Sequence, residues 1–292
     1  MIWQTTHYPL DLSRPLIMGI VNLTPDSFSD GGLLGATGLA QRRCEQLVAD
    51  GADLLDIGGE STRPGAPAVS AEVELGRILP AVRHALTLGV AVSVDTRKPA
   101  VMRAVLELGV DVINDVGGLS DPESLAAVAG HPSCGVCVMH MHRDPLTMQA
   151  APMIGDAVPV VREFLAAATE RLLSRGVARE RIVIDPGIGF GKTVAQNFSL
   201  LARQRELASL GFPLMAGWSR KSSLGAVTAR GGVVPLADDR LAASVAAALL
   251  AVQRGATIVR VHDVRETMQA LAVWQAVCDA ESNVPRHGAG KS

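Results

Sequence analysis

The feature of this sequence that most restricts its fold is a repeated alternation of short apolar segments with longer amphipathic ones. The apolar segments are rich in β-branched residues and predict strands at residues 16–21, 53–57, 90–94, 111–113, 135–139, 181–184, 213–216 and 257–261. Stretches with helical spacing lie between and after them, at residues 39–50, 72–88, 99–108, 158–175, 198–210, 240–253 and 265–278. Nearly continuous apolar strands that alternate with helices indicate a parallel sheet covered by helices.

The number of these units, about eight, predicts a single (β/α)₈ barrel of the α/β class. A doubly wound open sheet is the alternative, but it usually carries a glycine-rich phosphate turn after its first strand, and residues 22–26 (NLTPD) form no such turn. The length of 292 residues suits one barrel, and no linker divides the chain. We therefore expect one domain over residues 1–283, followed by a disordered tail over residues 284–292.

Composition and charge argue against several classes of function. A net charge of −2 supplies no basic field, so no nucleic-acid partner is expected. The longest apolar helical stretch, residues 241–252, is too short to span a bilayer, and residues 1–8 lack the pattern of a signal peptide. The sequence therefore predicts a cytoplasmic protein without a membrane partner.

The 4 cysteines of the chain do not form the pattern of a disulfide framework. Cys134 and Cys137 have a C-x-x-C spacing, but they lie in an apolar run that is typical of a buried strand, and no second pair follows. Packing in the core is therefore favoured over a zinc or redox role.

Two other motifs are weak on inspection. Residues 186–193 (PGIGFGKT) resemble a phosphate-binding P-loop, but that motif requires glycine where Pro186 stands. His140 and His142 have the spacing of a metal pair on a strand. A barrel metallohydrolase would need more imidazoles at later strand ends, where the chain has Asp185 instead. Neither motif carries a function by itself.

Polar side chains follow every predicted strand. In a barrel the carboxyl ends of the strands meet on one face, where active sites lie. The residues at these ends are Asn22, Asp56, Glu60, Ser61, Thr62, Arg63, Asp95, Asn114, Asp115, His140, Asp185, Ser219, Arg220, Lys221, Arg260 and His262. A helix cap or a loop salt bridge explains any one of them, but the complete ring indicates an active site.

One group within this ring suits a phosphorylated ligand. Arg63, Arg260 and His262 follow the second and eighth strands, which are neighbours but one around a closed barrel, and guanidinium groups bind phosphate oxygens in pairs. Asn22 lies between them and offers a neutral oxygen to a Mg²⁺ ion that keeps waters and phosphate oxygens as its other ligands. The sequence contains no complete metal cage, which fits a metal that arrives with its diphosphate.

A second group suits a planar heterocycle. Asp95, Asn114, Asp185 and Lys221 stand at strand ends, where carboxylates and an amide can bind a guanine-like edge of N–H donors. Each polar group would cost on the order of 1–3 kcal/mol if it were left unpaired, so the group enforces specificity.

These residues together resemble the dihydropteroate synthases, enzymes of bacterial folate synthesis, over residues 14–277. The matching blocks are residues 19–32 (GIVNLTPDSFSDGG), 56–65 (DIGGESTRPG), 93–97 (SVDTR), 113–116 (INDV), 139–141 (MHM), 185–192 (DPGIGFGK), 219–222 (SRKS) and 260–263 (RVHD). Several specific blocks in the family's order make the resemblance far more specific than any single glycine-rich motif.

The resemblance implies a homodimeric barrel that condenses 6-hydroxymethyl-7,8-dihydropterin diphosphate with 4-aminobenzoate, releasing diphosphate and 7,8-dihydropteroate. It implies that Asn22 contacts Mg²⁺. The residues it implies for the pterin diphosphate are Thr62, Arg63, Asp95, Asn114, Met139, Asp185, Lys221, Arg260 and His262. Those it implies for 4-aminobenzoate are Phe28, Pro64, Phe190, Lys221 and Ser222, the last at the N-terminus of a helix.

From the chemistry of these substrates we expect a dissociative, SN1-like substitution. The catalytic residues are then Asp95, Arg63, Lys221, Arg260 and His262. Loops at residues 24–33 and 62–68 are expected to close over the diphosphate. No insertion interrupts the loop of Phe190, so a sulfonamide-susceptible enzyme is expected.

Two other functions stay open from the sequence. A pterin-dependent methyltransferase barrel would bind its pterin with carboxylates in the same way. It would not require Arg63 or the pair Arg260 and His262, because its substrate carries no diphosphate. A catalytically silent pterin-binding homologue would be expected to lose Asn22, Arg63 or the block at residues 219–222, and all of these are present.

Overall fold

The structure of the chain is a computed structural model, and it describes residues 1–24, 32–63, 65–144, 147–148 and 150–282. Two predicted aminobenzoate contacts, Phe28 and Pro64, lie outside the described residues. The predicted tail at residues 284–292 and most of the predicted lid at residues 24–33 also lie outside them.

Among the described residues, eight parallel strands form one sheet in the order β8-β7-β6-β5-β4-β3-β10-β9. Their bounds are β3 (Leu16–Asn22), β4 (Leu54–Gly58), β5 (Ala91–Asp95), β6 (Val112–Asp115), β7 (Gly135–Met139), β8 (Ile182–Asp185), β9 (Met215–Ala216) and β10 (Ile258–Val261). A parallel bridge between Ile184 and Leu214 connects β8 to the residue before β9 and closes the sheet. The predicted (β/α)₈ barrel is therefore confirmed.

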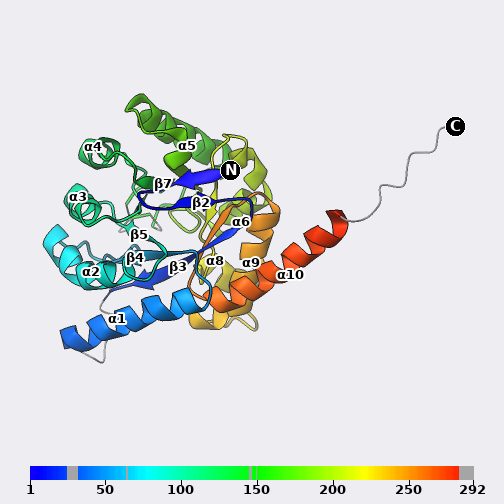
Figure 1. Cartoon of the computed structure of the whole chain (residues 1–292). Coiled ribbons are helices and arrows are strands. Elements are labelled where there is room, and N and C mark those ends of the chain that lie inside the picture. Colours follow the sequence, from blue (N-terminus) through cyan, green and yellow to red (C-terminus); the bar gives the residue numbers. More distant parts are fainter. Residues whose placement is uncertain (25–31, 64, 145–146, 149, 283–292) are drawn as a thin grey trace.

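The helices surround the strands (Figure 1). Their bounds are α1 (Gly32–Ala49), α2 (Ala71–Ala85), α3 (Pro99–Glu107), α4 (Pro122–Gly130), α5 (Ala157–Ser174), α6 (Val194–Ala202), α7 (Gln204–Ala208), α8 (Ser222–Thr228), α9 (Leu241–Gln253) and α10 (Val264–Ser282). The sequence did not predict α4, because its nine residues show little contrast between an apolar and a polar face. Asp121 precedes this helix as its N-cap. The helix expected at residues 198–210 is two helices, divided at Arg203.

A short hairpin closes the amino end of the barrel. It consists of β1 (Ile2–Gln4) and β2 (Pro9–Asp11), which pair in an antiparallel register. Trp3 is completely buried among inward-facing strand residues such as Met18 and Val183, and its indole N–H donates to the carbonyl of Arg181 at 2.9 Å. The amino end is thus filled by described residues, and a ligand cavity opens at the carboxyl end of the barrel.

A second and larger core lies between the strands and the helices. Cys134 and Cys137 are buried on β7 or beside it, and all four cysteines of the chain are free, which confirms core packing for the C-x-x-C pair. No helix in the described part of the chain is long and apolar enough to cross a membrane.

Candidate active site

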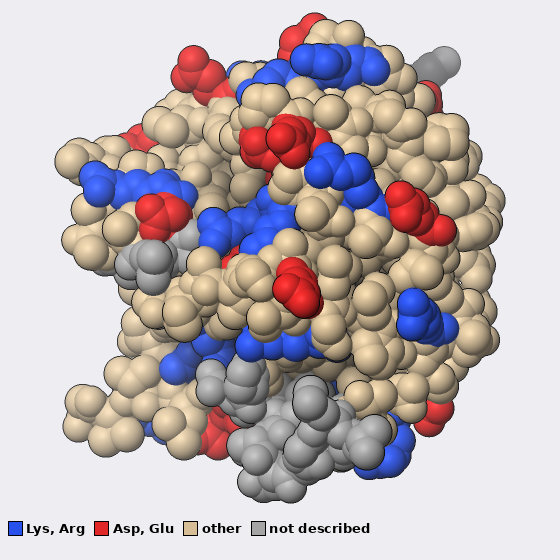
Figure 2. Space-filling view, turned by 90° about the vertical axis from the view of Figure 1, so that its left-hand side faces the viewer, with Lys and Arg blue, Asp and Glu red and all other residues tan. Residues whose placement is uncertain are grey.

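The carboxyl ends of the strands surround a cavity of about 1220 Å³. Figure 2 shows lysine and arginine side chains gathered around a hollow of the surface. The predicted site residues that line this cavity are Asn22, Thr62, Arg63, Asp95, Asn114, Met139, Asp185, Phe190, Lys221, Ser222, Arg260 and His262. Every described residue that the resemblance assigns to a substrate or to the metal therefore lies on one cavity, although these residues come from six strands, four loops and the start of α8.

Arg260 lies at the centre of the site, held between two carboxylates. Its Nε donates to Asp56 at 2.6 Å, and its Nη2 donates to Asp95 at 2.8 Å. Asp56 is fully buried and also accepts hydrogen bonds from Ser93 Oγ at 2.6 Å and from Asn114 Nδ2 at 3.1 Å. Asp56 is not part of the cavity wall, so its role is to orient Arg260 and Asn114 from behind.

Burial sets the electrostatics of the site floor. It raises the pKa of Asp95 to about 7, although Arg260 opposes this shift. Burial also raises the pKa of Asp185, whose Oδ1 accepts from the amide of Gly187 at 2.7 Å. Lys221 is affected in the opposite direction, because burial and the nearby charge of Arg260 lower its pKa to about 8. The floor therefore offers two carboxyl groups, both with pKa values raised by burial, to a ligand rich in N–H groups.

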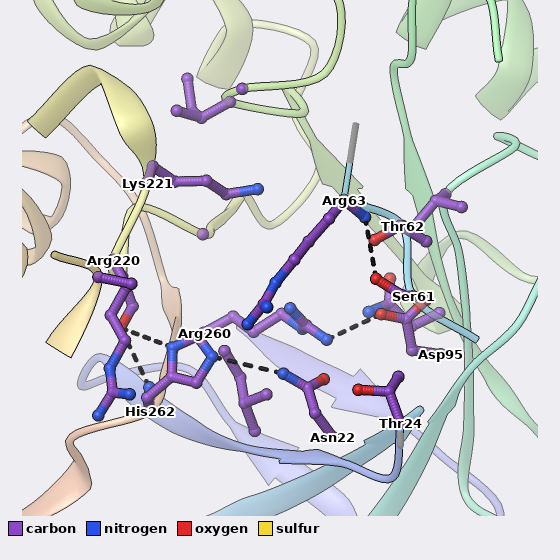
Figure 3. A pocket seen from close by; sticks show the side chains of 18 of the residues that line it. Asn22, Thr24, Ser61, Thr62, Arg63, Asp95, Arg220, Lys221, Arg260 and His262 are labelled. Carbon is purple, nitrogen blue, oxygen red and sulfur yellow. Dashed lines mark hydrogen bonds and ion pairs between the residues drawn. The ribbon is translucent and has the colours of Figure 1, made fainter. Parts of the chain in front are cut away.

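His262 is held as a neutral ring. Burial, followed by the charges of Arg220 and Arg260, lowers its pKa to about 2. Its Nδ1 lies 3.0 Å from Ser219 Oγ, and its Nε2 lies 3.5 Å from Asn22 Nδ2. Since the amide nitrogen of Asn22 can only donate, Nε2 is the accepting nitrogen and the ring proton sits on Nδ1. The amide oxygen of Asn22 consequently faces away from His262 (Figure 3).

Thr62 and Arg63 lie on the loop after β4, and the side chain of Arg63 extends into the cavity (Figure 3). Glu60 fixes the base of this loop. Its carboxylate accepts from the amide of Val69 at 3.0 Å and from Arg97 Nε at 3.1 Å, and it lies 3.0 Å from Lys98 Nζ. Because Arg97 and Lys98 follow Asp95 on the chain, Glu60 connects the loop of Arg63 to the segment after β5.

The predicted aminobenzoate residues within the described part of the chain also come together. Lys221 Nζ lies 4.2 Å from the centre of the Phe190 ring. Ser222 begins α8, as expected, with Lys221 as the N-cap residue. The neighbouring Arg220 has a φ of +62° and pairs with Asp238 and, at 2.7 Å, with Asp263. Its guanidinium therefore points away from Lys221 (Figure 3).

The donors near Asn22 fit a metal only if the metal brings other ligands. The described residues contain no cluster of three or more His, Cys, Asp or Glu side chains that could hold an ion. Asn22 contributes one neutral oxygen, and the guanidinium groups of Arg63 and Arg260 on the same cavity are suited to anions. His140 is buried, and its ring packs at nearly a right angle to that of Phe164 at a centroid distance of 5.0 Å. This donor set matches a Mg²⁺ ion bound together with a diphosphate.

Sequence reasoning missed two contributors. Asp56 was recognised only as a strand-end residue, without its link to Arg260. Arg43 of α1 lines the cavity and donates to the carbonyl of His262 at 2.5 Å. The continuous apolar run of β4 contained a signal for Asp56, because a carboxylate in an otherwise apolar buried strand needs a partner. No motif marked Arg43.

Comparison with known proteins identifies the family. A model of the pterin binding enzymes matches residues 18–262. The dihydropteroate synthase of Neisseria meningitidis serogroup B is 46% identical over 281 residues, which cover 94% of this chain and 97% of that protein. The dihydropteroate synthase of Escherichia coli K12 is 44% identical, with 94% and 95% covered. The crystal structure of Burkholderia cenocepacia dihydropteroate synthase matches with a TM-score of 0.87 and 50% identity, over 96% of this chain and 98% of that chain. The chain therefore belongs to the pterin binding enzymes and, among them, to the dihydropteroate synthase family.

Proposed function

We propose that the cavity binds 6-hydroxymethyl-7,8-dihydropterin diphosphate and 4-aminobenzoate side by side and joins them by a dissociative substitution. The observation that carries this proposal is Arg260, fixed by Asp56 and Asp95 in one cavity with Arg63 and His262. Related structures support it: the Burkholderia cenocepacia enzyme was solved with 7,8-dihydropteroate, and the Xanthomonas albilineans enzyme with 4-aminobenzoic acid. A Yersinia pestis relative holds a sulfonamide drug, and we propose the same susceptibility here.

The pterin would occupy the floor of the cavity. Asp95 and Asp185 face it with carboxyl groups whose pKa values burial raises, and Asn114 adds an amide that Asp56 orients. N–H donors of the heterocycle would satisfy these groups, and unpaired buried acceptors would reject a ligand that lacks such donors. Met139 and the Arg260 guanidinium would pack against the faces of the ring, and Lys221 would donate to one of its acceptors.

The diphosphate would lie beside the pterin, between Thr62, Arg63, Arg260 and His262. Asn22 would hold the Mg²⁺ ion through its amide oxygen, and such an ion would help to neutralise the charge of the diphosphate. The incoming anion would raise the pKa of His262, so that the ring could gain a proton and donate to a phosphate oxygen. These groups surround the position where negative charge grows as the bond between carbon and diphosphate breaks.

The chemistry follows from which bond is hard to break. The aryl amine is neutral at pH 7 and already carries its lone pair, so it needs little help from a base. The carbon–oxygen bond to diphosphate must break, and Arg63, Arg260 and His262 would stabilise the leaving anion. Asp95 would face the cationic pterin-methyl fragment that develops on the other side of that bond.

The amine would attack from the pocket beside Phe190 and Lys221, next to Ser222. Lys221 is close enough to the Phe190 ring to be held there by a cation–π contact. The carboxylate of the amine substrate would bind at the beginning of α8. Phe28 and Pro64 stay predicted members of this pocket.

Release of diphosphate tests the proposal. Purified protein with the pterin diphosphate and Mg²⁺ should release diphosphate rapidly only when 4-aminobenzoate is present, and chelation of the metal should stop the release. Slow release without the amine would support a dissociative step in which water captures the cation. Tight pterin binding without any release would instead indicate a silent homologue.

The variant Asp95→Asn tests the role of the carboxylate. It should lower kcat by about 10²-fold or more, as expected for removal of a charge that acts mainly in the transition state, with a much smaller loss of pterin affinity. Asp279→Asn, an exposed α10 residue far along the chain from the site, is the matched control and should change neither quantity. Equal losses in kcat and in affinity would contradict this role of Asp95.

We further propose a homodimer and a cytoplasmic location. α9 and α10 pack against each other, and α10 exposes Met268, Val273 and Val277, which a second copy could cover. Free cysteines suit a reducing compartment. Light scattering at several concentrations would measure the mass; a single-chain mass throughout would contradict the dimer.

A further inference from the structure

Lys192 belongs to the P-loop-like run that the proposed chemistry does not use. Its side chain is only 2% exposed and takes no part in lining the cavity. Its ammonium donates to the carbonyl oxygens of Gly187 at 2.8 Å, Phe190 at 3.1 Å and His140 at 3.3 Å. An ammonium has three protons, so these three acceptors match its donors one for one.

This arrangement is costly compared with an apolar side chain. Burial lowers the pKa of Lys192 to about 7, although the nearby Asp185 opposes the shift. Taking an ammonium out of water is unfavourable, and packing alone would be better served by methionine or leucine. What the ammonium stabilises is the arrangement of three carbonyl groups, which would otherwise point toward one another without a hydrogen-bond donor.

The backbone between Asp185 and Lys192 depends on this ordering. Gly187, Gly189 and Gly191 have φ values of +66°, +84° and +69°. Every second residue of the turn therefore adopts a left-handed backbone conformation that favours glycine. A Cβ atom on Gly187 would lie 1.9 Å from the carbonyl oxygen of His140, which shows how closely this turn lies against the end of β7. The ammonium of Lys192 fills the inside of the turn.

The turn carries residues of both proposed substrate sites, but it does not hold them equally. Asp185 is the last residue of β8, pairs with Met139 in the sheet and accepts from the Gly187 amide. Phe190 lies in the turn itself, and its carbonyl bonds directly to Lys192. The sheet thus secures the pterin contact, whereas Lys192 secures the aminobenzoate contact.

The turn is also connected to α8. The amide of Gly189 donates to Asn197 Oδ1 at 2.9 Å, and Asn197 Nδ2 donates to Ser223 Oγ at 2.9 Å. The Phe190 ring meets Lys221, the N-cap of α8, from the cavity side. Both sides of the aminobenzoate pocket, the ring and the start of the helix, therefore depend on the position of this turn.

We propose that Lys192 is a positioning residue for 4-aminobenzoate, whose ammonium holds the Gly187 and Phe190 carbonyls and so presets the wall formed by Phe190 and Lys221. The inference rests on the proposed assignment of Phe190 and Lys221 to the aminobenzoate pocket. It predicts that the two substrates respond differently when the ammonium is removed. Affinity for the amine should fall, while affinity for the pterin diphosphate should change little.

The test compares Lys192→Met with Lys192→Arg in the full-length protein. Lys192→Met should raise the KM for 4-aminobenzoate roughly tenfold, as expected for a contact partner displaced by loss of charged hydrogen bonds, with less than about a threefold change in the calorimetric Kd of the pterin diphosphate. Lys192→Arg keeps a charged donor and should recover part of the loss. Hydrogen exchange of a peptide spanning residues 186–192 should be faster in Lys192→Met and less so in Lys192→Arg.

Val105→Ala, which removes buried atoms from α3, is the control for general destabilisation. The proposal is overturned if the methionine variant keeps the wild-type KM for the amine, or if it loses affinity for both substrates equally and resembles Val105→Ala. Phe190→Ala separates the proposal from the pocket assignment beneath it. If Phe190→Ala leaves the amine KM unchanged, the pocket assignment is wrong and the proposal falls with it. If only Phe190→Ala raises the KM, the role of Lys192 alone is refuted.

Discussion

Replacing Asp56 by asparagine should disable the site without touching either substrate. The Asp56 carboxylate accepts from Ser93, Asn114 and Arg260. A serine hydroxyl can rotate and an asparagine amide can turn over, so Ser93 and Asn114 can adapt to the new amide. Arg260 cannot adapt, because its guanidinium has donors only. The cost of the substitution therefore falls on the contact between Arg260 and residue 56.

The size of that cost follows from the geometry. A hydrogen bond to a charged group contributes about 1.5–3 kcal/mol, and breaking a fully buried pair costs about 3–5 kcal/mol. Arg260 keeps Asp95 at 2.8 Å and its side chain is 19% exposed, so the lower range applies. We expect the free energy of unfolding to fall by about 2 kcal/mol and Tm to fall by about 3–4 °C. Because Arg260 would lose the charge that holds it in place, kcat should fall by about 10- to 100-fold.

Thermal unfolding by calorimetry and steady-state kinetics on the same preparation measure both effects. Asp111→Asn is the matched control, because Asp111 is equally buried and accepts from the amides of His7 and Val92, but at the amino end of the barrel. It should lose stability while keeping kcat. If Asp56→Asn retains wild-type kcat, or if Asp111→Asn loses as much kcat, the orienting role of Asp56 is refuted.

Three further substitutions test other parts of the site. Gly187→Ala should lower the free energy of unfolding by about 3 kcal/mol or more, since the methyl group meets the His140 carbonyl; an unchanged urea midpoint would refute this. Glu60→Gln should raise the KM for the pterin diphosphate several-fold by loosening the loop of Arg63. An unaltered KM in steady-state kinetics would refute the role of Glu60 in fixing that loop. Burial lowers the pKa of Lys221 to about 8 from 10.5, so the unfolded chain binds more protons between these values. The wild type should therefore gain stability between pH 8 and 10.5 relative to Lys221→Met, and parallel pH profiles in chemical denaturation would exclude that contribution.

The fold could be predicted because its pattern is repeated. Nearly continuous apolar runs that alternate with segments of helical period can be read without long-range information, and about eight repeats leave few architectures. The hairpin of β1 and β2 escaped because its strands have three residues each, too few for a period to show. β9 has two residues and was still found, since Leu214 before it extends its apolar run.

The sequence predicts which residues form the site, but not which of them form hydrogen bonds with one another. Strand ends converge in a barrel, so Asp95, Asn114 and Arg260 were expected to meet. Which of them bond to one another depends on register: Gly58 pairs with Asp95, which places Asp56 two residues lower, opposite Ser93 and beneath the Arg260 guanidinium. That offset arises from the closed sheet and is not visible in any local pattern.

The buried Trp3 has a consequence for how the chain folds. Its indole bonds to a carbonyl that lies 178 residues later in the chain. β3 likewise pairs with β10, near the other end of the sequence. Neither contact can form during the early part of synthesis, and the cost of closing such long loops slows folding. Trp3 must therefore stay unburied until the segment that carries Arg181 has been synthesised, so the hairpin docks on the barrel late in folding.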